Sequence, residues 1–155
     1  MILKNGENLV HNIVLVSGGF DPIHSGHIAL IQAASKFGAV VVLLNSDKWL
    51  QQKKGKEFLS FKERKIILGS IKKVIDVIEF DDSDKTCVEG IKKALKKYPE
   101  YKIKFANGGD RNNKTAPTPE IEFCKNNNID TLWGVGGDFK MNSSSWILNN
   151  WTQNN

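Results

Sequence analysis

The segment from Gly18 to His27, GGFDPIHSGH, gathers the residues of this chain best suited to phosphate chemistry. Its two leading glycines allow a tight turn and let the backbone approach a ligand closely. His24 and His27 are three residues apart at the start of an expected helix, so both lie on one face of its first turn. The unpaired amides and positive dipole end of a helix start favour phosphate. Two imidazoles placed there could donate hydrogen bonds to phosphoryl oxygens as negative charge develops.

The histidine pair taken alone has two less specific interpretations. Histidines at this spacing could bind a metal ion, but no third ligand lies nearby in the sequence and no HExxH pattern is present. They could also be ordinary capping or surface residues. The ten-residue string as a whole favours phosphate chemistry over both.

That string resembles the signature of the HxGH nucleotidyltransferases, a superfamily with a Rossmann-like fold, and His24 to His27 match HxGH in full. Members include sugar-phosphate adenylyltransferases and cytidylyltransferases acting on glycerol, choline or ethanolamine phosphate. The resemblance implies that both histidines bind a nucleoside triphosphate (NTP) and stabilise the transition state, with Mg²⁺ bridging the phosphates. The acceptor's phosphate would attack the α-phosphorus without a covalent enzyme intermediate. The implied nucleotide-binding residues of this segment are Gly18, Gly19, Phe20, Asp21 and Gly26.

The region after the second expected strand extends the resemblance. Asn45-Ser46-Asp47 is similar to the family's NSD segment, near the acceptor and nucleotide pockets. The lysines that follow resemble a mobile loop that reaches phosphates. By resemblance, Lys53 is catalytic, and Asp47, Lys54 and Lys56 contact the acceptor. A shift of one residue would exchange the lysines, so the choice among them stays open.

Three later segments complete the likeness. Glu63-Arg64 resembles a helix-borne ER pair whose arginine contacts the ligand, and the guanidinium fork suits a phosphate. Asn107-Gly108-Gly109-Asp110 looks like the KGGD segment of the heptose-phosphate adenylyltransferases, with asparagine in place of lysine; Gly109 and Asp110 are assigned to the nucleotide. Ser143-Ser144-Ser145 resembles the second family signature, at a helix start where hydroxyls and amides would hold the β- and γ-phosphates. A serine triplet alone is more often a helix cap.

Apolar runs and capping signals predict the elements that must position these residues. Strands are expected over residues 13–20, 39–46, 74–80, 101–107 and 129–135. Helices are expected over 24–37, from Ser60 with Glu63 as a capping box, in the lysine-rich stretch 91–98, from Pro119, and over 143–151. Residues 48–58 are expected to form a loop. The acidic residues Asp81, Asp82 and Asp84 are expected in a surface loop, and Trp146 and Trp151 in the core.

This alternation predicts an α/β, Rossmann-like three-layer fold with a five-stranded parallel sheet, built as a single domain over residues 1–155. Ligands in such sheets bind beyond the carboxyl ends of the strands. The informative loops are therefore those that follow the five expected strands.

Composition narrows the class of protein. The 155 residues are 40% apolar and 25% charged, as in globular proteins, without the ~20-residue apolar run of a membrane span. The chain opens without a secretion signal, and its two cysteines form no CxxC pair, which favours a reduced, cytoplasmic protein. The net charge is +5, and the lysines of the stretch 91–98 alternate with apolar residues, as on the solvent-exposed face of an amphipathic helix. We therefore expect no nucleic-acid or membrane partner, and a homodimer is possible.

The expected function is transfer of a nucleoside monophosphate (NMP) from an NTP, with ATP slightly favoured, to a sugar phosphate, releasing pyrophosphate. The expected partners are an NTP and a phosphorylated small molecule, with Mg²⁺ bound mainly through the NTP phosphates. One alternative is a CTP-dependent cytidylyltransferase for glycerol phosphate or a similar alcohol phosphate; a nicotinate-mononucleotide adenylyltransferase fits less well. An alternative of another class is a nucleotide-binding regulatory domain without catalysis.

Overall fold

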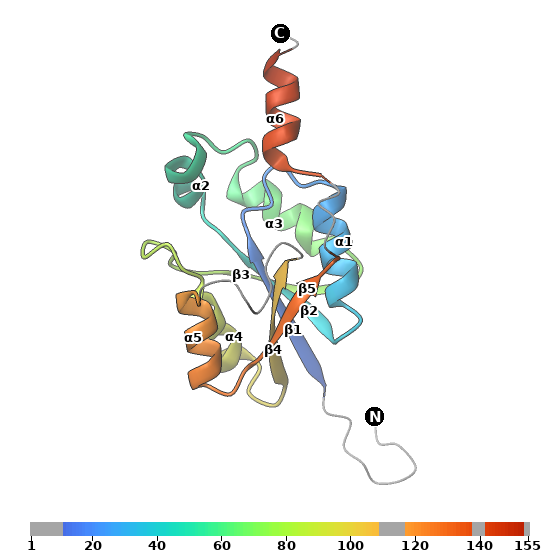
Figure 1. The fold of residues 1–155 in the computed structure, drawn as a ribbon, viewed down its shortest axis with the longest axis vertical. Coiled ribbons are helices and arrows are strands. Elements are labelled where there is room, and N and C mark those ends of the chain that lie inside the picture. The colour runs from blue at the N-terminus through green and yellow to red at the C-terminus, as the bar shows by residue number, and fades with distance from the viewer. Residues whose placement is uncertain (1–10, 109–116, 138–141, 154–155) are drawn as a thin grey trace.

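A computed structural model describes residues 11–108, 117–137 and 142–153. Five parallel strands form one sheet in the order β3-β2-β1-β4-β5 (Figure 1). The strands are β1 Asn12–Gly18, β2 Ala39–Leu44, β3 Val74–Glu79, β4 Lys102–Gly108 and β5 Asp130–Val135. The helices are α1 Ser25–Ala34, α2 Asp47–Lys54, α3 Phe61–Gly69, α4 Val88–Lys97, α5 Pro119–Asn126 and α6 Ser144–Gln153. The predicted α/β fold with a five-stranded parallel sheet is confirmed.

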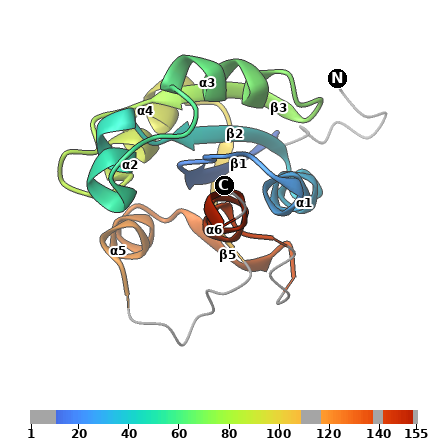
Figure 2. The same cartoon turned by 90° about the horizontal axis from the view of Figure 1, so that it is seen from above.

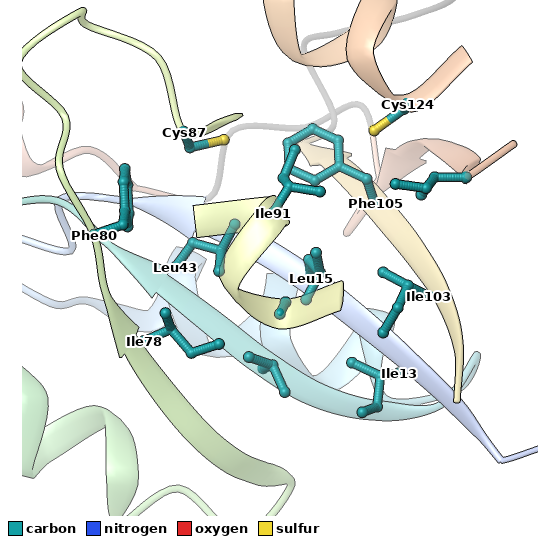
Figure 3. Packing of buried hydrophobic residues seen from close by; sticks show 13 residues of the cluster. Ile13, Leu15, Leu43, Ile78, Phe80, Cys87, Ile91, Ile103, Phe105 and Cys124 are labelled. Atoms are coloured by element: carbon teal, nitrogen blue, oxygen red, sulfur yellow. The ribbon is translucent and has the colours of Figure 1, made fainter. Parts of the chain in front are cut away.

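The sheet is buried on both faces. Successive residues of a strand point to opposite sides, and in β1 the residues on both sides are buried. In β1, Ile13 and Leu15 face one hydrophobic cluster, and Val14 and Val16 face the other. Figure 3 shows the first cluster, in which Ile91 of α4 packs over the strands. Burying one such side chain contributes roughly 1.5–3 kcal/mol to stability.

Helices cover both faces of the sheet. Figure 2 shows α4 and α5 on one side and α1 on the other. In α4, Ile91 and Ala94 are fully buried while Lys92 and Lys93 are exposed, so the lysine-rich stretch is the amphipathic helix that the sequence predicts. On the opposite face, Ile31 of α1 and Leu68 of α3 complete the second cluster.

The prediction of a loop over residues 48–58 was wrong, because α2 occupies Asp47–Lys54. The Ser46 hydroxyl caps this helix by accepting a hydrogen bond from Trp49 N at 3.0 Å. Leu50 is the buried anchor of the helix. One cap and one apolar contact therefore fold a stretch whose polar composition predicts a loop.

The prediction that Trp146 and Trp151 lie in the core was also wrong. Their exposed fractions are 50% and 66%, and no described side chain of α6 is buried. Figure 1 shows α6 rising beyond the carboxyl ends of the strands. In the described parts of the chain, no helix has the length and apolar character needed to cross a membrane.

Candidate functional site

The candidate site lies where the strand order reverses, between β1 and β4. From β1 the chain proceeds outward to β2 and β3, and then returns to place β4 on the other side of β1. The loops leaving the carboxyl ends of these two neighbours diverge, which opens a crevice between them. The segment Gly18–His27 leaves β1 at this crevice, as the sequence predicts.

The two histidines form a stacked pair at the start of α1. His24 is the N-cap, and its Nδ1 accepts a hydrogen bond from Gly26 N at 3.0 Å. His27 Nδ1 accepts from His24 N at 3.2 Å, and the two ring centroids are 3.8 Å apart. A neutral imidazole whose Nδ1 accepts carries its proton on Nε2. Each ring is therefore a cap through one nitrogen and a donor through the other.

His27 is held in its neutral form. Burial, together with the neighbouring His24 and Lys54, lowers the pKa of His27 from 6.5 to about 4. The Phe20 ring, whose centroid is 4.9 Å from that of His27, is part of this apolar cover. At neutral pH the His27 ring is therefore uncharged, and the proton on its Nε2 makes that nitrogen a hydrogen-bond donor.

A second helix start lies beside the first. Ser144 Oγ, at the beginning of α6, donates to the Pro22 carbonyl at 3.0 Å, although the two residues are 122 positions apart. A Cβ added at Gly26 would lie 3.6 Å from Asn142 N and only 2.9 Å from the His24 ring. Glycine at position 26 thus lets the His24 ring pack closely, and the segment before α6 lies at ordinary contact distance from the same position. Two helix N-termini that converge on one loop strongly favour an anion.

The serine triplet divides into different environments. Ser143 is buried, and its carbonyl accepts from Ile147 N at 3.1 Å. Ser144 bridges to the β1–α1 loop, as above, and Ser145 is exposed. Gly109 and Asp110, the other two late candidates, lie outside the described residues. The roles of these five residues in nucleotide binding stay predictions.

Arg64, predicted as a ligand contact, is 1% exposed and bound within the protein. Its Nε donates to the Leu59 carbonyl at 3.0 Å, and its Nη1 to the carbonyls of Gly19 and Asn45, each at 2.8 Å. Its Nη2 pairs with Asp47 Oδ1 at 2.6 Å. The guanidinium therefore joins the loops that follow β1 and β2 to α3. This positioning role is what the described contacts show.

Asp21, predicted as a nucleotide contact, fastens the β1–α1 loop to the segment after α2. It is 2% exposed, and its two carboxylate oxygens accept from Phe58 N and Leu59 N at 2.7 Å each. Lys54 Nζ lies 3.1 Å from Asp21 Oδ2 and also donates to the Asp21 carbonyl. The aspartate thus holds the β1–α1 loop, which carries the histidines, against α2 and the segment after it.

The three candidate lysines are placed differently. Lys54 is engaged by Asp21, whereas Lys53 Nζ lies 4.5 Å from the centre of the Trp49 ring and lines the crevice. Lys56 is exposed beyond the end of α2, past Gly55. The structure therefore brings Lys53 to the crevice, together with Gly18.

The crevice holds a cavity of about 280 Å³ on the side of β1 that faces α4 and α5. Its wall combines the ends of β1 and β4 with residues from α2 and the loops before α4 and α5. Members of this wall that carry polar or charged side chains include Asn45, Lys53, Lys85, Asn107, Thr118 and Glu120. Among the described residues, no group of three His, Cys, Asp or Glu side chains could hold a metal ion.

Asp82 was wrongly expected in a solvated acidic loop. It is 7% exposed, and its carboxylate accepts from Asn45 Nδ2 at 3.1 Å, Ser46 N at 2.8 Å and Ser46 Oγ at 2.7 Å. Asp82, in the loop that follows β3, therefore fixes Ser46, the N-cap residue of α2. Its position immediately after the third strand, where loops meet the site, was the signal available in the sequence. Trp49, Thr118 and Glu120 were missed as well, and only the fold brings them to the crevice.

Comparison with known proteins agrees with this geometry. The model of the family "cytidylyltransferase-like" matches residues 15–152. Glycerol-3-phosphate cytidylyltransferase of Bacillus subtilis (strain 168) is 39% identical over 66 residues, covering 42% of this chain and 51% of that protein. The bifunctional protein HldE of Enterobacter sp. (strain 638) is 32% identical over 120 residues, covering 69% of this chain and 24% of that protein. The chain thus spans about half of the first relative and a quarter of the second.

Solved structures show the same fold. A protein assigned as a nicotinate-nucleotide adenylyltransferase from Vibrio parahaemolyticus superposes with a TM-score of 0.64 at 18% identity, covering 93% of this chain and 88% of that one. A lipopolysaccharide core biosynthesis protein from Thermoplasma volcanium GSS1 gives 0.57 at 21%, covering 79% and 94%. With the family match over nearly its whole length, the chain belongs to the cytidylyltransferase-like family.

Proposed function

We propose that this protein is a nucleotidyltransferase that moves an NMP group from an NTP to a small phosphorylated acceptor. The observation that carries the proposal is the meeting of the stacked pair His24 and His27 with the starts of α1 and α6. Such a site suits a chain of phosphates, and it lies at the crevice where parallel sheets bind ligands. Membership of the cytidylyltransferase-like family supports the same chemistry.

In this proposal the β- and γ-phosphates lie between the two helix starts, near Ser144. A phosphate oxygen of the acceptor attacks the α-phosphorus, a new P–O bond forms, and the bond to the β-phosphate oxygen breaks to release pyrophosphate. The Nε2–H groups of His24 and His27 donate to phosphoryl oxygens whose charge grows in the transition state. The remaining catalysis is positioning, because the acceptor supplies its own nucleophile.

We assign Mg²⁺ to the oxygens of the triphosphate. Mg²⁺ commonly retains several waters and binds through substrate phosphates with one or two carboxylates. When bound, the ion would neutralise charge on the phosphates. The protein's own contribution is then the pair of imidazole donors and the amides of two helix starts.

The acceptor belongs in the cavity on the α4 and α5 side of β1, within reach of Gly18 and Lys53. We favour a sugar phosphate with ATP as donor, on the resemblance of Asn45–Asp47 and Asn107–Asp110 to the heptose-phosphate adenylyltransferases. The second candidate is CTP with glycerol phosphate, favoured by the 39% identity to the glycerol-3-phosphate cytidylyltransferase. Both candidates use the same site in the same way.

The test is pyrophosphate release with ATP or CTP, Mg²⁺ and a panel of sugar, alcohol and nucleotide phosphates. Release that requires one NTP and one acceptor is the expected result and names both substrates. An NTP that binds without release against the whole panel would contradict the proposal and support a regulatory nucleotide-binding domain.

A further inference from the structure

Two residues in the wall of the acceptor cavity each have a buried polar side-chain atom without a hydrogen-bond partner among the described residues. The atoms are Nδ2 of Asn107, which is 5% exposed near the end of β4, and Oγ1 of Thr118. Both residues line the same cavity of about 280 Å³. Buried polar groups in proteins are nearly always paired, so two unpaired atoms on residues of one cavity wall call for an explanation.

Thr118 occupies a position where its hydroxyl has an obvious alternative use. It is the N-cap residue of α5, yet its side chain makes no capping hydrogen bond. An N-cap threonine ordinarily stabilises its helix by accepting from an amide of the first turn. Here the helix begins with Pro119, and Thr118 lines the cavity wall. The hydroxyl therefore does not cap the helix, and it stays buried without a partner beside the cavity.

A carboxylate completes the set. Glu120 lines the cavity, and its Oε1 accepts from Cys87 N at 3.1 Å. A carboxylate has about four acceptor positions on its two oxygens, so one such bond leaves capacity for others. The residues of the cavity wall thus carry two unpaired amide N–H donors on Asn107, an unpaired hydroxyl on Thr118 and acceptor capacity on Glu120. This mixture matches hydroxyl groups, which both donate and accept.

The cavity is poorly suited to a quaternary ammonium group. Such a group neither donates nor accepts a conventional hydrogen bond, and proteins recognise it through open aromatic faces. Among the described residues, the aromatic side chains in the wall are Trp49 and Phe105. Lys53 Nζ already lies over the Trp49 ring at 4.5 Å, so a cation occupies one face of that ring. Lys53 and Lys85 instead give the cavity positive charge for the acceptor's phosphate.

Resting on the proposed function of this site, we propose that Asn107 and Thr118 select the acceptor through its hydroxyl groups. The acceptor is then a phosphorylated polyol or sugar, and choline phosphate is rejected because it leaves both atoms unpaired. Sites built to hydrogen-bond a hydroxyl discriminate strongly against analogues that lack it. Asn107 stands where the resemblance to heptose-phosphate adenylyltransferases has lysine, so this selection is particular to this chain.

Calorimetric binding of three probes tests the proposal: glycerol 3-phosphate, ribose 5-phosphate and choline phosphate, each with the wild type, Asn107→Leu and Thr118→Val. We expect at least one hydroxylated probe to bind at least tenfold more tightly than choline phosphate. Each variant should weaken that binding by about 3- to 10-fold, the loss of one neutral hydrogen bond, and leave NTP binding unchanged. Both variants should melt at the wild-type temperature or above it, because each removes an unpaired buried group.

Asn127→Ala is the matched control, because Asn127 Nδ2 on the exposed end of α5 is paired with the Phe123 carbonyl. It should bind every probe as the wild type does. Equal affinity for choline phosphate, unchanged binding in both variants, or no binding of either hydroxylated probe would overturn the proposal. Hydroxylated probes that bind but give no pyrophosphate with any NTP would instead count against the proposed function and leave the selection by hydroxyl groups standing.

Discussion

At the scale of single residues, the histidine pair does two things at once. Nδ1 of His24 and Nδ1 of His27 each accept a hydrogen bond from a backbone amide at the start of α1, so each ring has a structural role independent of any ligand. Removing a ring therefore removes a cap as well as a donor. A useful variant must separate the two effects.

His24→Asn makes this separation, because asparagine is a preferred N-cap that lacks the second nitrogen of the ring. We expect turnover to fall roughly 10²–10³-fold, the usual loss for one transition-state donor, with little change in melting temperature. Steady-state pyrophosphate release and thermal melting measure the two effects. His24→Ala is the comparison, and it should also lose about 1 kcal/mol of stability with the cap. Normal turnover in His24→Asn would mean that His24 is only a cap.

The lowered pKa of His27 makes the folded protein sensitive to acid. The folded state keeps this ring neutral down to about pH 4, whereas the unfolded chain binds the proton near pH 6.5. As the pH falls through this window, the unfolded state takes up the proton first. The free energy of unfolding should therefore drop between pH 6.5 and pH 4, by up to about 3 kcal/mol.

Urea unfolding of the wild type and His27→Gln at several pH values isolates this contribution, since glutamine does not titrate. The stability of His27→Gln relative to the wild type should rise as the pH falls from 6.5 to 4. Parallel curves for the two proteins would show that His27 is not held neutral by the fold.

At the scale of elements, the sequence predicts the strands and most helices because their signals are local. Apolar β-branched runs such as Val40 to Leu44 identify buried strands, and Ser60 caps α3 by accepting from Glu63 N. The helix α2 escapes prediction because its cap depends on Asp82, a residue distant in the chain. Local patterns cannot reveal such a partner.

Asp82 is expected to govern the order of α2. Asp82→Ala leaves the Asn45 amide and the Ser46 hydroxyl without their shared acceptor, which typically costs about 1–3 kcal/mol. Hydrogen exchange in α2 should accelerate more than in α4. Asp81→Ala is the control, since Asp81 is exposed and accepts from Ser83 in its own loop, with Ser83 N at 2.9 Å. Equal exchange in both variants would contradict a positioning role for Asp82.

Arg64 has a structural role that its motif does not predict. The sequence suggests a ligand contact, and the structure places three guanidinium nitrogens on four protein oxygens from the loops after β1 and β2, the segment before α3 and the first residue of α2. Arg64→Lys keeps the charge but loses the fork, so we expect about 2–4 kcal/mol of lost stability. Urea unfolding measures the loss, with Lys62→Ala, an exposed position on the same helix, as the control. A variant as stable as the wild type but slow in turnover would restore the ligand contact as the main role.

At the scale of the whole molecule, the site is assembled from segments that only the topology brings together. Gly18, Asn107 and Thr118 line one cavity because β4 pairs with β1 and the chain then enters α5. The sequence predicts that the loops converge at the carboxyl edge. It does not predict which side chains stay unpaired there, since pairing depends on neighbours far along the chain.

The same topology links the stability of α6 to the triphosphate. No described side chain of α6 is buried, and Ser144 Oγ to the Pro22 carbonyl is a direct tie between its start and the β1–α1 loop. A triphosphate bound between the starts of α1 and α6 would add hydrogen bonds to both helices. At 100 times its dissociation constant, MgATP or MgCTP should stabilise the protein by about 2.7 kcal/mol, which raises the melting temperature by roughly 5–10 °C.

Ser144→Ala should bind the triphosphate several-fold more weakly and show a correspondingly smaller rise in melting temperature at the same NTP concentration. Hydrogen exchange in α6 should slow on adding MgNTP to the wild type, and less so in the variant. Ser70→Ala is the matched control, because Ser70 Oγ only donates to the Ile66 carbonyl at the exposed end of α3. If MgNTP stabilises Ser144→Ala as fully as the wild type, the triplet is a helix cap alone, and the triphosphate must be held by α1 and the histidines without α6.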